Sequence, residues 1–152
     1  MIAVIQRVFD AAVYADGELS GKIGKGLYIL LGVEKSDSEQ DALLLAEKIS
    51  KLRIFSDKNG KMNISVKDVD GEALVVSNFT LNANYSHGNR PDYFSSAAPT
   101  EADRLYEHFK MLLGDRVRRV ESGVFGADMR TEMSTDGPVT IVMSSDVLKG
   151  GK

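Results

Sequence analysis

Polar and aromatic side chains of several kinds occur together at residues 77–81, whose sequence is Ser-Asn-Phe-Thr-Leu. At the end of an apolar strand they could form a binding surface for a ligand, with Phe79 available for stacking and Ser77 and Thr80 as hydrogen-bond partners. Composition alone favours a simpler interpretation, in which the hydroxyl groups bind backbone groups where the strand ends. The segment is a candidate site that needs further support.

A second candidate is the segment Thr-Asp-Gly-Pro-Val-Thr at residues 135–140. Gly137 can adopt backbone conformations that other residues resist, and Pro138 lacks an N–H and permits a cis peptide bond. A Gly-Pro step at a loop tip would leave carbonyl oxygens directed outward, with no competing amide from the proline. The spacing is equally compatible with an ordinary turn before a strand.

Residues that commonly carry acid–base or metal chemistry are scarce. The chain has two histidines and no cysteine, which excludes disulfides, thiolate metal sites and a thiol nucleophile. His108 lies off the apolar stripe of a predicted helix, so a solvated histidine is the favoured interpretation. His87 lies in a polar loop, where a catalytic role remains the less favoured alternative. We therefore expect no metal site, no cofactor and no Ser-His-Asp arrangement.

Two basic segments could bind phosphate, but a structural explanation is favoured for each. Gly21 to Gly26 precedes a strand instead of opening a helix, so its amides would not converge on a phosphate and a hairpin connection is expected. Arg116, Arg118 and Arg119 fit a solvated strand edge, with phosphate contacts as the alternative.

Overall charge also limits the partners. With 19 basic and 22 acidic residues the net charge is −3, whereas proteins that grip a long duplex usually carry a basic excess. Contact with DNA is therefore not expected, and contact with RNA should be local, such as one terminus held in a pocket. No apolar run is long enough for a membrane helix, and the first residues lack the features of a secretory signal, so we expect a cytoplasmic protein.

The candidate residues must be positioned by strands and helices, and the sequence contains signals for both. Asp16-Gly17 predicts a hairpin turn, and the unbroken apolar run at 27–33 predicts a buried strand. A strong strand over 72–81 leads into a long polar loop over 84–99, of a length that is often functional. Further strands are predicted over residues 2–9, 11–15, 116–121 and 139–143.

Two main helices are predicted. The first begins at Ser36, with Glu39 completing a capping box, and the second is capped by Thr100. The tail from Ser144 is expected to fray, with residues 149–152 outside the fold. Together these elements predict one α+β domain over residues 1–148, with a curved, barrel-like and mostly antiparallel sheet.

Several segments in the same order and spacing resemble one family. The chain resembles the D-aminoacyl-tRNA deacylase family, also called D-tyrosyl-tRNA deacylase, over nearly its whole length. Residues 77–83 are similar to the family's Ser-Gln-Phe-Thr-Leu motif, and residues 135–140 to its Asn-x-Gly-Pro-[Val/Phe]-Thr motif. Further matches are Leu52 to Phe55, Gly60 to Asn63, Arg90-Pro91, Ala97 to Pro99 and Phe125 to Met129.

The resemblance implies a compact homodimer that hydrolyses the ester of D-aminoacyl-tRNA, or of glycine mischarged on tRNA-Ala. It implies a cis bond between Gly137 and Pro138, in a loop that enters the partner's site and whose carbonyls reject L-amino acids. Arg7 would support this loop. Ser77, Asn78, Phe79 and Thr80 would line the pocket for the terminal adenosine and the ester.

For the mechanism, the resemblance implies attack by water, assisted by the terminal 2′-hydroxyl of the tRNA, with the Phe79 amide stabilising the oxyanion. Thr80 is the alternative nucleophile, but no base lies near it in sequence. Asn78 and Thr135 replace the family's usual Gln and Asn. Two rival functions remain: a tRNA- or nucleotide-binding module without turnover, and a small-ester hydrolase with a covalent Thr80.

Overall fold

Strand β1 (Ile2–Ala15) organises the main sheet of the computed structural model, which describes residues 1–150. One edge of β1 pairs with β8 (Met129–Ser144) along its length. The other edge pairs first with β3 (Gly26–Gly32) and then with β2 (Glu18–Ile23), and all three pairings are antiparallel. The sequence predicted two strands, over 2–9 and 11–15, where the structure has one.

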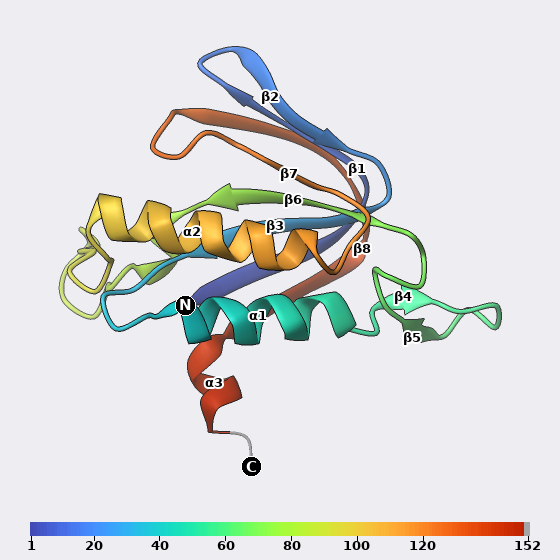
Figure 1. Ribbon diagram of the computed structural model, residues 1–152. Helices are drawn as coiled ribbons and strands as arrows, with labels where there is room; N and C mark the ends of the chain where they lie inside the picture. The colour runs from blue at the N-terminus through green and yellow to red at the C-terminus, as the bar shows by residue number, and fades with distance from the viewer. Residues whose placement is uncertain (151–152) are drawn as a thin grey trace.

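The sheet continues through β6 (Glu72–Ser77) to β7 (Val120–Ser122), and both of these additions are parallel. It curves strongly (Figure 1), and β2 and β7 approach each other. The Ser20 hydroxyl donates to the Ser122 carbonyl oxygen across this approach at 3.0 Å, which nearly closes the sheet into a barrel. A small separate sheet joins β4 (Phe55–Ser56) to β5 (Met62–Ile64). The predicted α+β class with a curved, mostly antiparallel sheet is confirmed.

Helices α1 (Glu39–Lys51) and α2 (Pro99–Gly114) pack beside each other on one side of the sheet (Figure 1). Their apolar stripes are buried in the main core, with α1 contributing Ala42, Leu45, Ala46 and Ile49 and α2 contributing Leu105, Tyr106, Phe109 and Leu113. A second cluster, which includes Val8, Val13, Tyr28 and Leu74, fills the inside of the curved sheet. Both faces of β3 are therefore covered, as its unbroken apolar run predicted.

The helix starts differ from those predicted. Helix α1 is capped by Ser38, whose N–H donates to the Asp41 carboxylate at 2.9 Å, so the capping box lies two residues after the predicted Ser36–Glu39 pair. Helix α2 begins at Pro99, not after Thr100, because the fixed φ of proline suits the first helical position.

Three other boundaries also differ from the sequence prediction. β6 ends at Ser77 and is followed by a single 3-10 turn, η1 (Phe79–Asn82), where the prediction extended the strand to residue 81. β7 covers Val120–Ser122 instead of 116–121. The chain after Ser144 forms a short helix, α3 (Ser145–Lys149), where fraying was expected, and residues 151–152 of the expected tail lie outside the described residues.

Strand β8 contains the largest irregularity of the sheet. Gln6 pairs with Thr140 and Val8 pairs with Thr135, so the four residues 136–139 lie opposite the single residue Arg7. The sequence predicted a loop tip followed by a strand over 139–143, but the Gly137–Pro138 step is a bulge inside one long strand. Bulges of this kind redirect the chain and are common beside functional sites.

Candidate active site

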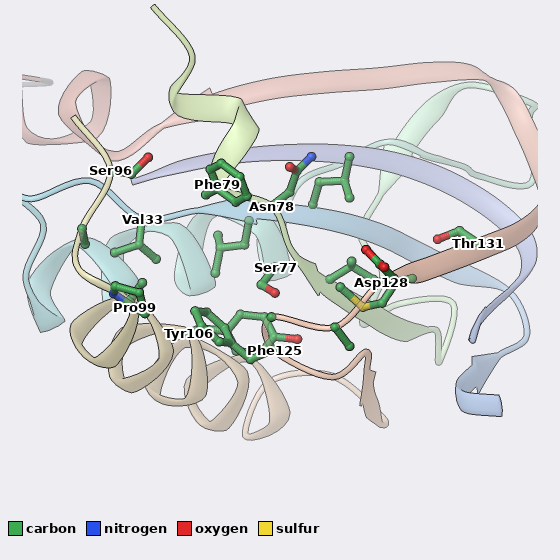
Figure 2. A pocket seen from close by; sticks show the side chains of 18 of the residues that line it. Val33, Ser77, Asn78, Phe79, Ser96, Pro99, Tyr106, Phe125, Asp128 and Thr131 are labelled. Carbon is green, nitrogen blue, oxygen red and sulfur yellow. The ribbon is translucent and has the colours of Figure 1, made fainter. Parts of the chain in front are cut away.

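A cavity of about 700 Å³ opens where β3 and β6 end. Its walls come from these strand ends, from the first turns of α2 and from the segment between β7 and β8 (Figure 2). The rings of Tyr106 and Phe125 form an apolar wall, with their centroids 6.0 Å apart. A cavity with apolar walls and a few polar groups is a typical small-molecule site.

The strand end contributes three of the predicted site residues to this cavity, namely Ser77, Asn78 and Phe79. Asn78 continues the sheet for one more hydrogen bond, from its N–H to the Leu31 carbonyl oxygen at 2.8 Å. Its side-chain oxygen then accepts the Thr80 N–H at 3.1 Å and caps the turn η1. The strand-to-turn transition therefore holds the three residues at the cavity wall.

Thr80 lies in the turn but is not part of the cavity lining. Its hydroxyl donates to the Asn78 side-chain oxygen. An amide oxygen accepts hydrogen bonds but is too weak a base to remove the proton of a hydroxyl. This contact therefore orients the Thr80 hydroxyl without activating it as a nucleophile.

The backbone N–H of Phe79 differs from that of Thr80 in its hydrogen bonding. The first N–H groups of a helical turn have no acceptor within that turn. The Thr80 N–H is bound by Asn78, whereas the Phe79 N–H has no acceptor among the hydrogen bonds of residues 1–150. It is available to a ligand at the cavity wall.

Phe79 lies at the cavity with a largely exposed ring (Figure 2). The ring of Tyr93, from the long polar loop, forms a T-shaped pair with this ring, with the centroids 5.0 Å apart. Two aromatic side chains from separate segments therefore meet at the cavity.

The cavity also includes residues to which the sequence analysis gave no role. Asp128 and Thr131 line it at the start of β8, and Tyr28 lines it from β3. The Tyr28 and Thr131 hydroxyls are 3.0 Å apart, and burial raises the pKa of Tyr28 above its usual value. Residues 125–129 matched the family resemblance and could have been recognised from it, whereas no local signal marks Tyr28 or Thr131.

Arg7, Gly137 and Pro138 lie together at the bulge, and none of them lines the cavity of their own chain. Arg7 donates from Nε to the Asp136 carbonyl oxygen at 3.0 Å and from its terminal nitrogen to the Asp136 carboxylate at 3.2 Å. Gly137 and Pro138 are exposed, and the peptide bond between them is cis. The two groups of predicted site residues therefore occupy different places on one chain.

The basic residues of the strand edge are engaged in ion pairs. Arg119 binds both carboxylate oxygens of Glu72 at 3.1 Å, and this bond lowers the pKa of Glu72. Arg116 contacts Glu47 at 3.4 Å. The described residues contain no group of three or more His, Cys, Asp or Glu side chains placed to hold a metal ion. No helix within residues 1–150 is long and apolar enough to cross a membrane.

Comparison with known proteins identifies the family. A family model described as D-Tyr-tRNA(Tyr) deacylase matches residues 4–144. The D-aminoacyl-tRNA deacylase of Akkermansia muciniphila is 52% identical over 146 residues, covering 95% of this chain and 97% of that protein. That of Dictyoglomus turgidum is 49% identical over 149 residues, covering 98% and 96%.

A solved structure described as c-Myc DNA Unwinding Element Binding Protein superposes with a TM-score of 0.89 at 37% identity, covering 95% of this chain and 98% of that one. Fold, motifs and relatives agree with the resemblance found in the sequence. The chain belongs to the D-Tyr-tRNA(Tyr) deacylase family, whose members are hydrolases that act on the ester bond of aminoacyl-tRNA.

Proposed function

We propose that the protein hydrolyses the ester of D-aminoacyl-tRNA, releasing the free amino acid and tRNA, and that it leaves L-aminoacyl-tRNA intact. The observation that carries this proposal is the cavity at the end of β6, where Ser77, Asn78 and Phe79 lie beside an apolar wall. The cavity would receive the terminal adenosine with its ester. We expect this reaction to take place in the cytoplasm, where charged tRNA is used.

The proposed chemistry needs no protein nucleophile. A water molecule would attack the ester carbonyl, assisted by the neighbouring 2′-hydroxyl of the terminal ribose, and the Phe79 N–H would stabilise the oxyanion. Two observations support this assignment: the Phe79 N–H has no acceptor among residues 1–150, and the Thr80 hydroxyl is directed to Asn78. No metal or cofactor is part of the proposed reaction.

Selection of the D-amino acid is assigned to the bulge. The carbonyl oxygens of Gly137 and Pro138 would occupy the space that the side chain of an L-amino acid needs, while a D-amino acid directs its side chain elsewhere. Glycine has no side chain to reject, so the proposal extends to glycine mischarged on tRNA-Ala. Arg7 would hold the bulge through Asp136.

The bulge can act on an ester only if another subunit brings it there, because Gly137 and Pro138 do not line the cavity of their own chain. We therefore propose a homodimer in which each bulge enters the partner's cavity. The exposed surface around the bulge supports this: Pro138, Thr140 and Val142 alternate outward along β8, and Val142 is 72% exposed. A sheet face that exposes apolar side chains such as Pro138 and Val142 is typically covered by another chain.

The first test is deacylation of D-Tyr-tRNA beside L-Tyr-tRNA with a chelator present. Release of the D-amino acid with the L-ester intact supports the activity, the chiral selection and the independence from metal together. Cleavage of neither ester while tRNA still binds would instead favour a tRNA-binding module without turnover, with Asn78 and Thr135 as the first residues to restore to Gln and Asn. Cleavage of simple esters with a burst of product would favour a covalent Thr80.

A further inference from the structure

A set of aromatic side chains is exposed on the long polar loop. Tyr85 is 78% exposed and Phe94 is 79% exposed, the two highest values among the large apolar residues of the described chain. Exposure of rings of this size to water is unfavourable. Such exposed apolar surface indicates a binding site for a ligand or a partner molecule.

The loop that carries these rings is held in place by hydrogen bonds. Asn84 and Asp92 exchange two backbone hydrogen bonds of 2.9 Å, and the Asp92 carboxylate accepts the Phe94 N–H at 3.2 Å. The Ser95 hydroxyl donates to the Asn82 carbonyl oxygen at 3.1 Å and joins the loop to the turn η1. Tyr85 and Phe94 are therefore presented on a braced backbone, which lowers the entropic cost of binding a ligand.

The loop that carries the exposed rings reaches the cavity through the contact of Tyr93 with Phe79. Phe79 lines the cavity, Tyr93 contacts Phe79, and Phe94 is the next residue along the chain. Tyr85 follows Asn84, whose bridge partner Asp92 precedes Tyr93. A ligand that extends out of the cavity past Phe79 would meet this surface next.

The charge of the loop fits a nucleic acid backbone. Arg90 is exposed, and it has no ion pair within residues 1–150. The one acidic side chain of residues 84–95, Asp92, is bound to Asn84 and to the Phe94 N–H. The loop thus offers stacking surfaces and an unpaired cation together, the combination found where single-stranded nucleic acid binds.

We propose that Tyr85 and Phe94 stack on the unpaired nucleotides that precede the terminal adenosine of the tRNA, with Arg90 beside their phosphates. This inference rests on the proposed function for the position of the terminal adenosine. Besides its aromatic residues, the loop over 84–95 contains mainly polar ones and no Val, Leu, Ile or Met of the kind that fills the centre of protein interfaces, so RNA is the better fit than another protein. The loop then adds affinity for the tRNA end without taking part in ester cleavage.

Two substrates that share one ester test this assignment: D-Tyr-tRNA, and D-tyrosyl-adenosine, which lacks the preceding nucleotides. The variants are Tyr85→Leu and Phe94→Leu, with Tyr85→Phe and Phe94→Tyr as matched controls that keep the ring. We expect each Leu variant to raise KM for D-Tyr-tRNA on the order of tenfold, with kcat unchanged. Hydrolysis of D-tyrosyl-adenosine should stay at the wild-type rate, and the ring-keeping controls should behave as wild type.

Binding of uncharged tRNA by the same variants, measured by fluorescence anisotropy, keeps the inference separate from the proposed function. If the wild type cleaves neither ester, the proposed function fails, while weaker tRNA binding by the Leu variants alone still supports the stacking surface. Equal tRNA binding by wild type and both Leu variants would overturn it. Loss of activity on both substrates together with dissociation of a dimer in light scattering would also overturn it, because the surface would then be a contact between copies of the chain.

Discussion

Arg7 lies opposite the bulge of β8 and donates from its Nε to the Asp136 carbonyl oxygen at 3.0 Å, although the two residues are 129 positions apart in the chain. A further bond reaches the Asp136 carboxylate at 3.2 Å, and the Arg7 side chain is 11% exposed. Charge-assisted hydrogen bonds in such a setting are stronger than neutral ones. The residue before Gly137 is therefore anchored to the central strand of the sheet.

Replacing this anchor should loosen the bulge. We expect Arg7→Met to lower kcat/KM for D-Tyr-tRNA by about 10- to 100-fold, since each charge-assisted bond contributes about 1.5–3 kcal/mol. Arg130→Met is the matched control, because Arg130 lies on β8, the strand that contains the bulge, and its partner Glu132 is exposed. Wild-type rates and wild-type protection of L-Tyr-tRNA in Arg7→Met would contradict a role of Arg7 in holding the bulge.

A methyl group at Gly137 should displace the carbonyls assigned to chiral selection. A Cβ placed there would lie 2.1 Å from the Val139 backbone nitrogen, so the backbone must shift. We expect Gly137→Ala to lose D-Tyr-tRNA hydrolysis by at least about tenfold or to begin cleaving L-Tyr-tRNA, since both depend on carbonyl position. Gly114→Ala is the control, because its Cβ would meet nothing closer than the Val120 side chain at 4.0 Å. Unchanged discrimination in Gly137→Ala would remove the bulge from the mechanism.

Removal of the Thr80 hydroxyl should leave the chemical step intact. The hydroxyl is directed to the Asn78 side chain, and Thr80 is absent from the cavity wall. We expect the single-turnover rate of Thr80→Ala to stay within about threefold of wild type, because the proposed nucleophile is water. A loss of several orders of magnitude would make Thr80 the nucleophile.

The cap provided by Asn78 should matter for stability and for rate. Asn78→Ala leaves the Thr80 N–H without its acceptor at the start of the turn, which should cost about 1 kcal/mol in urea unfolding. The same change would free the turn that carries the Phe79 amide, so kcat should fall while stability remains sufficient for folding. Asn78→Gln, which introduces the residue usual in the family, tests whether a longer amide restores the rate. An unaltered kcat in Asn78→Ala would argue against the amide of Phe79 as the oxyanion donor.

Acid should destabilise the protein partly through Asp41. Burial alone would raise the pKa of this carboxyl, but the Lys149 ammonium at 2.5 Å and the bonds with Ser38 outweigh burial and lower it. A folded pKa below the unfolded value means that the stabilisation is present above about pH 4 and is lost as the pH falls further. Lys149→Met raises the folded pKa, so its unfolding free energy should be lower at pH 7 and should depend less on pH between about 4 and 2.

Urea titrations across this pH range would measure both effects. Arg104→Met serves as the control, since Arg104 and its partners Glu39 and Glu101 are half exposed and such pairs contribute little. An identical pH dependence in Lys149→Met and wild type would show that the Lys149–Asp41 pair does not contribute.

Local sequence patterns correctly predicted a structural element wherever the residues of that one segment determine its conformation. The apolar run at 27–33 predicted a buried strand, and both faces of β3 are indeed covered. Asp16-Gly17 predicted the β1–β2 hairpin, since its turn requires the positive φ that both residues adopt. The family was recognisable because its motifs are short and contiguous. Ser36 and Ser38 were harder to separate, since each is followed by an acidic residue three positions later and only packing selects one register.

The composition of the site was decided by the tertiary structure. Tyr28 and Thr131 join Ser77 in one cavity because the curvature of the sheet brings β3, β6 and the start of β8 together. The four-residue bulge exists only in relation to β1, whose Arg7 it faces, so residues 136–139 by themselves could not distinguish it from a loop tip. The sequence alone thus determined the two main helices, the buried strand β3 and the family, since these depend on neighbouring residues. Pairing register and sheet curvature depend on contacts between distant segments, and these decided which side chains share the cavity and which lie outside it.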